Sequence, residues 1–213
     1  MNDYRAMHEA VISGDAERVI AEVTAAIARG TKPLDVIADG LNPPMAIVGQ
    51  HMQTGEMFIP EVLLSAEAMQ SGMNVLKPLL ASADIAAMRK GKVLIGTVEG
   101  DIHYLGKNLV AMMLDCAGFE IVDLGEDVPA AVFVDAVRRE QPRVLAMSSL
   151  MTTTMSHMKD VVDALCAAQL RANVKIIVGG APVTQVFAES IGVDAYAQNA
   201  SVAVEHVLSL AAT

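Results

Sequence analysis

Residues 93–108 read VLIGTVEGDIHYLGKN, and this stretch decides the fold. Its first six residues are mostly apolar and β-branched, which predicts a buried strand. A polar turn that contains Gly100 follows, and apolar residues then recur at helical spacing through residues 106–117. A buried strand that leads through a glycine-containing turn into a helix is the first unit of a parallel α/β sheet.

The same strand-and-helix unit recurs four more times along the chain. After the strand at 93–98, strands are predicted at residues 120–123, 144–148, 175–178 and 194–197, with helices near 106–117, 130–140, 156–168, 183–190 and 201–210. This alternation predicts five parallel strands with helices on both faces. The expected arrangement is flavodoxin/Rossmann-like with strand order 2-1-3-4-5, which places a ligand at the carboxyl ends of strands 1 and 3.

The residues before the sheet indicate a bundle of helices. Apolar residues recur there at three- and four-residue spacing, with little β-branched clustering. Asp15 can cap a helix that Gly30 ends, while Pro33 and Pro60 can each open another. Residues 53–56 (QTGE) are predicted to form the turn before Pro60.

These patterns predict an α/β protein of two domains. The first is an N-terminal helical bundle over residues 1–88, and the charged residues 89–92 (RKGK) form a linker. The second is the five-stranded α/β domain over residues 93–213. At this size each domain is large enough to bury a core of its own.

Composition argues against several classes of function. The formal net charge of −10, with no basic patch to offset it, disfavours a nucleic-acid partner. The apolar residues are spread out rather than gathered into a membrane span, and no signal-peptide pattern follows Met1, so a cytoplasmic protein is expected. Cys116 and Cys166 lie far apart, which favours reduced thiols over a disulfide or a zinc site.

Polar residues follow strands 1 and 3 of the predicted sheet and should meet at one edge. Asp101 and His103 are two apart, so one imidazole nitrogen could face a metal while the other donates to the carboxylate. A hydroxyl from Ser148 or Thr154 could complete a relay by bonding to Asp101. An isolated Asp-x-His pair is more often a surface pair, and the threonines of residues 152–154 could simply cap the next helix.

Glycines at the same edge leave room for a ligand. Gly106 opens a helix, and Gly179 and Gly180 leave a strand end without side chains, so a long ligand tail could pass between elements. A plain strand-to-helix turn is the alternative interpretation of such a pair. Zinc requires three or four converging ligands. A metal site with one histidine requires a group that holds the metal by itself, as a corrin ring does.

Across nearly its whole length the chain resembles a known family. Three motifs carry the likeness in the second domain: Asp101-x-His103-x-x-Gly106, Ser148-x-Leu150 and Gly179-Gly180. Together they resemble the signature of cobalamin-binding domains in which a histidine replaces the cofactor's own base. Residues 55–63 (GEMFIPEVL) resemble the helical cap that precedes this domain in methionine synthase and in corrinoid proteins of methyltransferase systems.

The resemblance implies a role for each matching residue. His103 would be the lower axial ligand of cobalt, with Asp101 and the Thr154 hydroxyl as its proton relay. Cap residues Met52 and Ile59 would cover the upper, methyl-bearing face. The remaining cofactor-binding residues, which would line the slot for the displaced nucleotide tail and the adjoining edge of the sheet, are Gly106, Ser148, Leu150, Thr152, Gly179 and Gly180.

The implied function is methyl carriage. Cob(I)alamin would take a methyl group from a substrate-specific methyltransferase, and methylcob(III)alamin would pass it to a methyl-acceptor methyltransferase, with a reductive activator as a further partner. The chain would then be one subunit of a multi-component system, and the linker near residues 88–92 would be a hinge that moves the cap. Alternatives are a cobalamin-dependent sensor or regulator, a small mutase subunit, and a flavodoxin-like domain that binds phosphate or flavin. The methyl donor cannot be read from the sequence.

Overall fold

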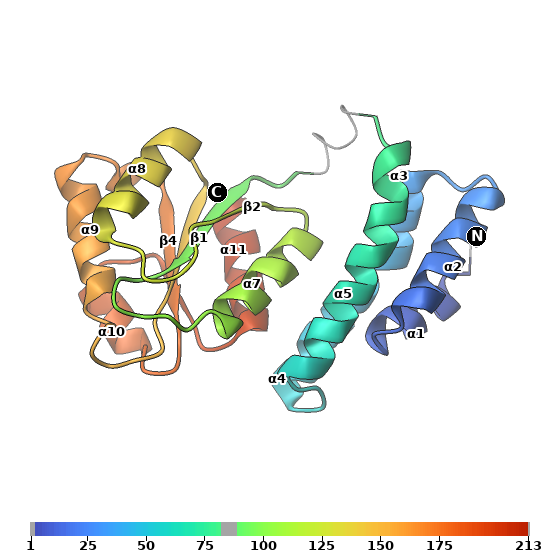
Figure 1. Ribbon diagram of the computed structural model, residues 1–213, viewed down its shortest axis with the longest axis horizontal. Coiled ribbons are helices and arrows are strands. Elements are labelled where there is room, and N and C mark those ends of the chain that lie inside the picture. Colours follow the sequence, from blue (N-terminus) through green and yellow to red (C-terminus); the bar gives the residue numbers. More distant parts are fainter. Residues whose placement is uncertain (1–2, 82–88, 213) are drawn as a thin grey trace. The chain divides into compact units, whose positions relative to one another are not determined.

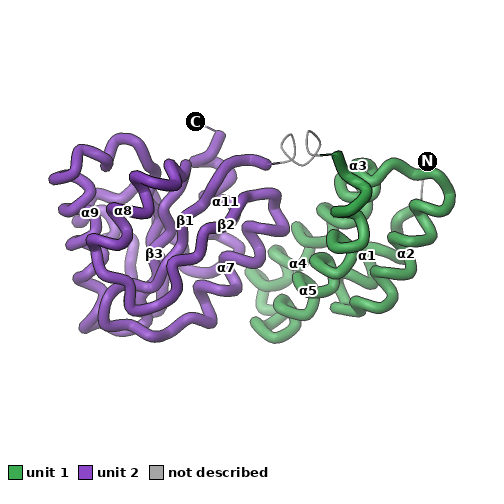
Figure 2. The backbone as a smooth tube through the Cα atoms, turned by 45° about the horizontal axis from the view of Figure 1, so that its top comes forward, with its two compact units in different colours: residues 1–88 green, residues 89–213 purple. Residues whose placement is uncertain are grey.

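The computed structural model describes residues 3–81 and 89–212. The chain divides into two compact units, Met1–Met88 and Arg89–Thr213, coloured separately in Figure 2. Residues 82–88, where the predicted helical domain ends and the predicted hinge begins, lie outside the described residues. Lys92, which the sequence analysis assigned to the linker, is the first residue of a strand.

The second unit is built on one parallel sheet (Figure 1). Its strands are β1 (Lys92–Thr97), β2 (Glu120–Asp123), β3 (Val144–Ser148), β4 (Lys175–Gly179) and β5 (Ala195–Ala197). They run in the order β2-β1-β3-β4-β5, with every neighbouring pair parallel. The predicted fold class and strand order are therefore confirmed.

Helices cover both faces of this sheet, and each face has its own hydrophobic core. The helices are α7 (Leu105–Cys116), α8 (Ala130–Glu140), α9 (His157–Ala167), α10 (Gln185–Ser190) and α11 (Ala200–Ala211), with a short 3-10 turn η3 (Arg171–Asn173) before β4. Leu94 of β1 packs with Phe133 of α8 and Met158 of α9. Its neighbour Val93 belongs to the opposite core, with Leu114 of α7. The alternation of side chains along a strand thus explains why β1 is apolar throughout.

The register of the sheet brings three strand ends together. Thr97 at the end of β1 pairs with Ser148 of β3, and Ser148 pairs in turn with Gly179 of β4. Because all three strands are parallel, the loops that follow them leave the same edge of the sheet. The motif residues of the second domain lie on these loops and at these strand ends, except for Gly106 in the first turn of α7.

The described residues of the first unit form helices joined by short turns. Its elements are α1 (Arg5–Ile12), α2 (Ala16–Ala28), α3 (Pro33–Asp35), the π-helix η1 (Val36–Leu41), α4 (Asn42–Thr54), α5 (Ile59–Leu76) and the 3-10 turn η2 (Lys77–Leu79). The Asp15 side chain caps α2 by accepting from the Arg18 N–H, as predicted. The predicted turn starts later than expected, because α4 continues through Thr54 and ends at the left-handed Gly55. Among the described residues of both units, no helix is both long enough and apolar enough to cross a bilayer.

The π-helix follows from two consecutive prolines. Pro43 has no N–H to donate to the carbonyl of Asp39, so a regular α-helical bond is missing there. The Nε2 of His8 lies 2.8 Å from that carbonyl oxygen and supplies the missing donor. The Asn42 N–H instead bonds five residues back, to Ile37. A contact between α1 and η1 thereby replaces a bond within the helix.

Candidate functional site

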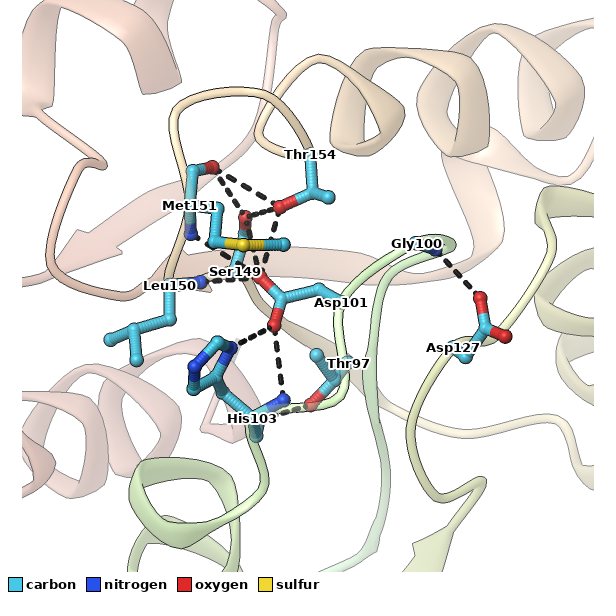
Figure 3. A network of polar contacts seen from close by, with 9 residues as sticks. All are labelled: Thr97, Gly100, Asp101, His103, Asp127, Ser149, Leu150, Met151 and Thr154. Carbon is cyan, nitrogen blue, oxygen red and sulfur yellow. Dashed lines mark hydrogen bonds and ion pairs between the residues drawn. The ribbon is translucent and has the colours of Figure 1, made fainter.

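The carboxylate of Asp101 is the centre of the site (Figure 3). Its side chain is completely buried and accepts hydrogen bonds on both oxygens. The Oδ1 atom accepts from the backbone N–H of His103 at 3.0 Å and lies 2.7 Å from the Nδ1 of the same residue. The Oδ2 atom accepts from the Leu150 N–H at 2.7 Å and from the Thr154 hydroxyl at 2.9 Å. One carboxylate therefore joins the loop after β1 to the loop after β3.

Two further donors from the second loop complete this arrangement. The Ser149 hydroxyl and the Met151 N–H each lie 3.3 Å from Oδ2 of Asp101, and the Ser149 hydroxyl is 2.8 Å from that of Thr154. Of the two hydroxyls considered from the sequence, Thr154 contacts Asp101. Among the hydrogen bonds of the described residues, none joins the Ser148 hydroxyl to Asp101.

The sequence analysis missed Ser149. Ser148 is still paired inside the sheet, with Thr97 on one side and Gly179 on the other. Ser149 is the first residue beyond the strand, where a side chain can turn towards the loop after β1. The end of the apolar run at Met147 and the alternation of side chains along the strand could have pointed to it.

These contacts keep Asp101 ionised. Burial alone would raise the pKa of its carboxyl group. The backbone N–H groups of His103 and Leu150, the His103 ring and the Thr154 hydroxyl all donate to it, and together they hold this pKa well below its ordinary value. An ionised carboxylate is only an acceptor, so it fixes the proton of the neutral imidazole on Nδ1.

His103 presents its other nitrogen to the outside. Its side chain is about half exposed, at 46%, in contrast to the buried carboxylate beside it. No hydrogen bond to Nε2 is found from residues 3–81 or 89–212. Since Nδ1 is held by Asp101, Nε2 carries a free lone pair suited to a metal. The Thr97 hydroxyl donates to the His103 carbonyl at 3.0 Å and so holds the backbone of the same residue.

Apolar side chains near His103 in sequence and on the loop after β3 are exposed. Ile102 is 67% exposed, Leu105 64%, Tyr104 48% and Leu150 45%. Three of these residues flank His103 in sequence, and Leu150 sits on the loop that holds Asp101. A cluster of exposed apolar residues at the edge of a sheet indicates a surface that a bound group covers.

The predicted glycines serve different purposes. A Cβ placed on Gly106 would meet no atom within 4 Å, so this side of α7 is open. A Cβ on Gly179 would lie 3.0 Å from the Ala197 carbonyl oxygen. A Cβ on Gly180 would overlap the Ser149 carbonyl oxygen. Gly180 also has a φ of +126°. The chain therefore needs glycine at 180 so that the backbone at Ser149 can approach.

The remaining predicted contact residues lie in the turn before α9 and in the helical unit. Thr152 is exposed in the turn before α9. Met52 in α4 is half-buried and Ile59 at the start of α5 is exposed, and both belong to the helical unit. They flank the Gly55 turn, next to Phe58, which is 68% exposed and was not among the predicted residues.

Lys107, also outside the predictions, fixes the first turn of α7. Its side chain is buried, and its Nζ donates to Asp123 at the end of β2 and to the Asn108 side chain. The ion pair ties the helix that follows His103 to the neighbouring strand. A buried lysine is tolerated here because both partners satisfy its charge.

The fold and the site together define a flavodoxin-like domain with one half-exposed histidine beside a buried carboxylate. Among the residues that the structure describes, no three His, Cys, Asp or Glu side chains are grouped to hold an ion. A metal at Nε2 must therefore bring its other ligands with it.

Family comparisons identify such a group. One model, described as B12 binding domain, matches residues 91–208, and a second model with the same description matches residues 4–77. The chain belongs to the B12-binding corrinoid proteins of methyltransferase systems, and it binds cobalamin. Both predictions from the sequence are confirmed.

Individual relatives agree with this assignment. The chain is 44% identical over 199 residues to a trimethylamine corrinoid protein of Methanosarcina barkeri, covering 93% of this chain and 92% of the relative. A cobalamin-binding protein from Desulfitobacterium hafniense DCB-2 is 31% identical, with a TM-score of 0.82 and 98% of each chain covered. The methanol:cobalamin methyltransferase complex of Methanosarcina barkeri contains a chain that is 33% identical, with a TM-score of 0.86, covering 98% of this chain and 79% of that one.

Replacing Asp101 with alanine should lower the free energy of unfolding by about 3 kcal/mol at pH 7, because buried N–H groups lose their acceptor. The pKa of the Asp101 carboxyl group is lower in the folded than in the unfolded chain. The stabilisation by ionised Asp101 is therefore complete at pH values above its unfolded pKa of about 3.9. It is lost as the pH falls below that value towards the folded pKa. Urea unfolding from about pH 7 down to pH 3 measures the difference between variant and wild type. A difference independent of pH would contradict the assignment. Asp163→Ala, at an exposed ion pair on α9, is the control and should cost less than about 0.5 kcal/mol.

Replacing Gly180 with alanine should destabilise the second unit by about 3 kcal/mol or more, because the new Cβ collides with the Ser149 carbonyl and φ is unsuitable. The matched control is Gly192→Ala. Gly192 also has a positive φ, +72°, but a Cβ there meets nothing within 4 Å. This control should cost only about 1 kcal/mol. Equal losses in the two variants, measured by urea unfolding, would show that the contact with Ser149 does not matter.

Proposed function

We propose that this protein carries a methyl group on cobalamin, with Nε2 of His103 as the lower axial ligand and the cofactor's own base displaced. The observation that carries the proposal is the half-exposed imidazole of His103. Its Nδ1 is held by a buried, ionised carboxylate, and the loops that carry the two residues also expose apolar side chains. That combination suits a ligand to a metal that is already held in a flat, largely apolar ring.

The residues present fit a cobalamin in two further respects. The exposed side chains of Ile102, Leu105 and Leu150 provide an apolar surface around His103 for a corrin ring to cover. The open side of α7 at Gly106 leaves space for the displaced nucleotide tail. When bound, the cofactor supplies a cobalt centre that accepts and releases a methyl group.

The protein's own residues fix the orientation of the His103 imidazole. Asp101 orients the imidazole and itself stays ionised, because its hydrogen bonds hold its pKa well below the ordinary value. His103 would hold the cofactor through Nε2, while its Nδ1 stays bonded to Asp101. Thr154 donates to the carboxylate and keeps it in place. The proposed proton relay would thus consist of His103, the ionised carboxylate of Asp101 and the Thr154 hydroxyl.

The remaining predicted residues retain their proposed roles. Ser148, Leu150, Thr152 and Gly179 border the strand ends where the tail would run. Met52 and Ile59 of the helical unit would shield the methyl-bearing face, and a hinge near residues 88–92 would move them aside.

The methyl donor and acceptor require partner proteins. A trimethylamine corrinoid protein is 44% identical to this chain, which makes a methylamine the first donor to test. We propose one methyltransferase specific for that donor, a second one for the acceptor, and a reductive activator, all in the cytoplasm.

Replacing His103 with alanine should leave cobalamin bound through its tail but abolish the absorption bands of the imidazole-coordinated cofactor. The imidazole is half exposed and Asp101 keeps its backbone donors, so the fold should tolerate the change. Adding hydroxocobalamin to the purified protein and recording the visible spectrum measures both effects. His206→Ala, on an exposed position of α11, should behave as wild type. An unchanged spectrum in His103→Ala would reject the ligand assignment.

Transfer assays separate a carrier from a sensor. The cobalamin-loaded, reduced protein should become methylated when it is mixed with a co-encoded methyltransferase and trimethylamine, dimethylamine, monomethylamine or methanol, each tested alone. The expected result is methylation with at least one methylamine and none with the His103→Ala variant beyond the rate of free cobalamin. A protein that binds cobalamin with histidine coordination but accepts a methyl group from no donor would favour the sensor.

A further inference from the structure

The connection between β2 and α8, residues 124–129, runs beside the end of β1. The Leu124 N–H donates to the Ile95 carbonyl at 2.8 Å, and the Thr97 N–H donates to Gly125 at 3.0 Å. The Val128 N–H returns to the Thr97 carbonyl at 3.0 Å, and Val98 forms a parallel bridge with Val128. Pairing between the two segments thus continues past the sheet, up to the loop that carries Asp101 and His103.

Asp127 makes two contacts at the end of this pairing, and Figure 3 draws the one to Gly100. Its carboxylate Oδ1 accepts from the Gly100 N–H at 2.7 Å. Its own backbone N–H donates to the Asp101 carbonyl at 2.9 Å. These two hydrogen bonds hold the consecutive residues Gly100 and Asp101, which precede His103 in the same loop.

The backbone at Asp127 is arranged for these contacts. Its φ is +53°, one of three non-glycine residues with positive φ in the described chain, and aspartate tolerates this region better than most residues. The loop that it contacts is itself a tight turn. The Asp101 N–H donates to the Val98 carbonyl at 3.2 Å, and Gly100 has a φ of +78°, as in a type II turn. Asp127 therefore holds this turn from outside, on the side away from β3.

We propose that Asp127 is a positioning residue for His103, acting through the backbone of Gly100 and Asp101. The loop after β3 holds the Asp101 carboxylate by its oxygens, whereas Asp127 holds the Asp101 backbone. Both are needed to fix the direction of the carboxylate and, through it, the imidazole. The part of the inference that concerns cobalt rests on the proposed function, and the part that concerns the loop does not.

Three substitutions separate the contributions of Asp127. Asp127→Gly keeps the positive φ but removes the acceptor for Gly100. Asp127→Asn keeps both the tolerance of positive φ and an acceptor oxygen. Gln169→Gly is the matched control, since Gln169 also has a positive φ, +59°, but lies after α9 and outside this loop.

Hydrogen exchange of the cofactor-free, full-length chain tests the loop. The His103 N–H, which bonds to the Asp101 side chain, should exchange about fivefold faster in Asp127→Gly than in wild type. It should be close to wild type in Asp127→Asn and in Gln169→Gly. An unchanged rate in Asp127→Gly would overturn the proposal.

The visible spectrum of the cobalamin-loaded proteins tests the effect on coordination. Asp127→Gly should show a smaller fraction of imidazole-coordinated cofactor, and Asp127→Asn should restore it. Faster exchange with unchanged coordination would overturn the positioning role, because Asp127 would then brace the loop without affecting His103. If wild type itself shows no imidazole coordination, the proposed function fails, and the exchange of the His103 N–H alone decides whether Asp127 positions this residue.

Discussion

A buried carboxylate that accepts hydrogen bonds from two loops connects the fold of this protein to its chemistry. Without partners, the charge of Asp101 could not be buried. The loop after β1 supplies His103, and the loop after β3 supplies Leu150, Ser149 and Thr154. These loops meet because β1 and β3 are parallel neighbours in register. The sheet therefore creates the site, and the satisfied charge in turn fixes the two loops relative to each other.

The same interaction divides the site into a rigid part and an open part. Each buried side-chain nitrogen or oxygen of the described residues, Asp101 included, has a hydrogen-bond partner, and Gly180 allows the Ser149 backbone to approach. On the same side of the chain, next to His103 in sequence, the apolar side chains of Ile102 and Leu105 are exposed. A site of this form can orient one ligand atom accurately, while the cofactor supplies the remaining metal ligands and the reactive centre. This agrees with the family to which the chain belongs.

Particular elements show how far sequence patterns reach. The bounds of β2 and β3 were predicted to the residue, because each is a short apolar run bounded by polar or turn residues. The turn predicted at residues 53–56 began too early, since only Gly55 needs a left-handed conformation and the residues before it can remain helical. Lys92 was placed in the linker because of its charge. Its side chain reaches Glu140 while its backbone pairs in β1.

The sequence by itself determined the alternation of strands and helices, because this depends on periodicity. The number of strands then predicted the sheet order by analogy with flavodoxin-like folds, and a spacing of two residues predicted the pairing of Asp101 with His103. Only the tertiary structure decided which hydroxyls reach Asp101, that its carboxyl group stays ionised, and that Asp127 holds the adjoining turn. Those features join residues about 25 to 50 positions apart in the chain. They depend on strand register and on differences of a few tenths of an ångström between donor–acceptor distances. Composition and spacing in the sequence do not encode either.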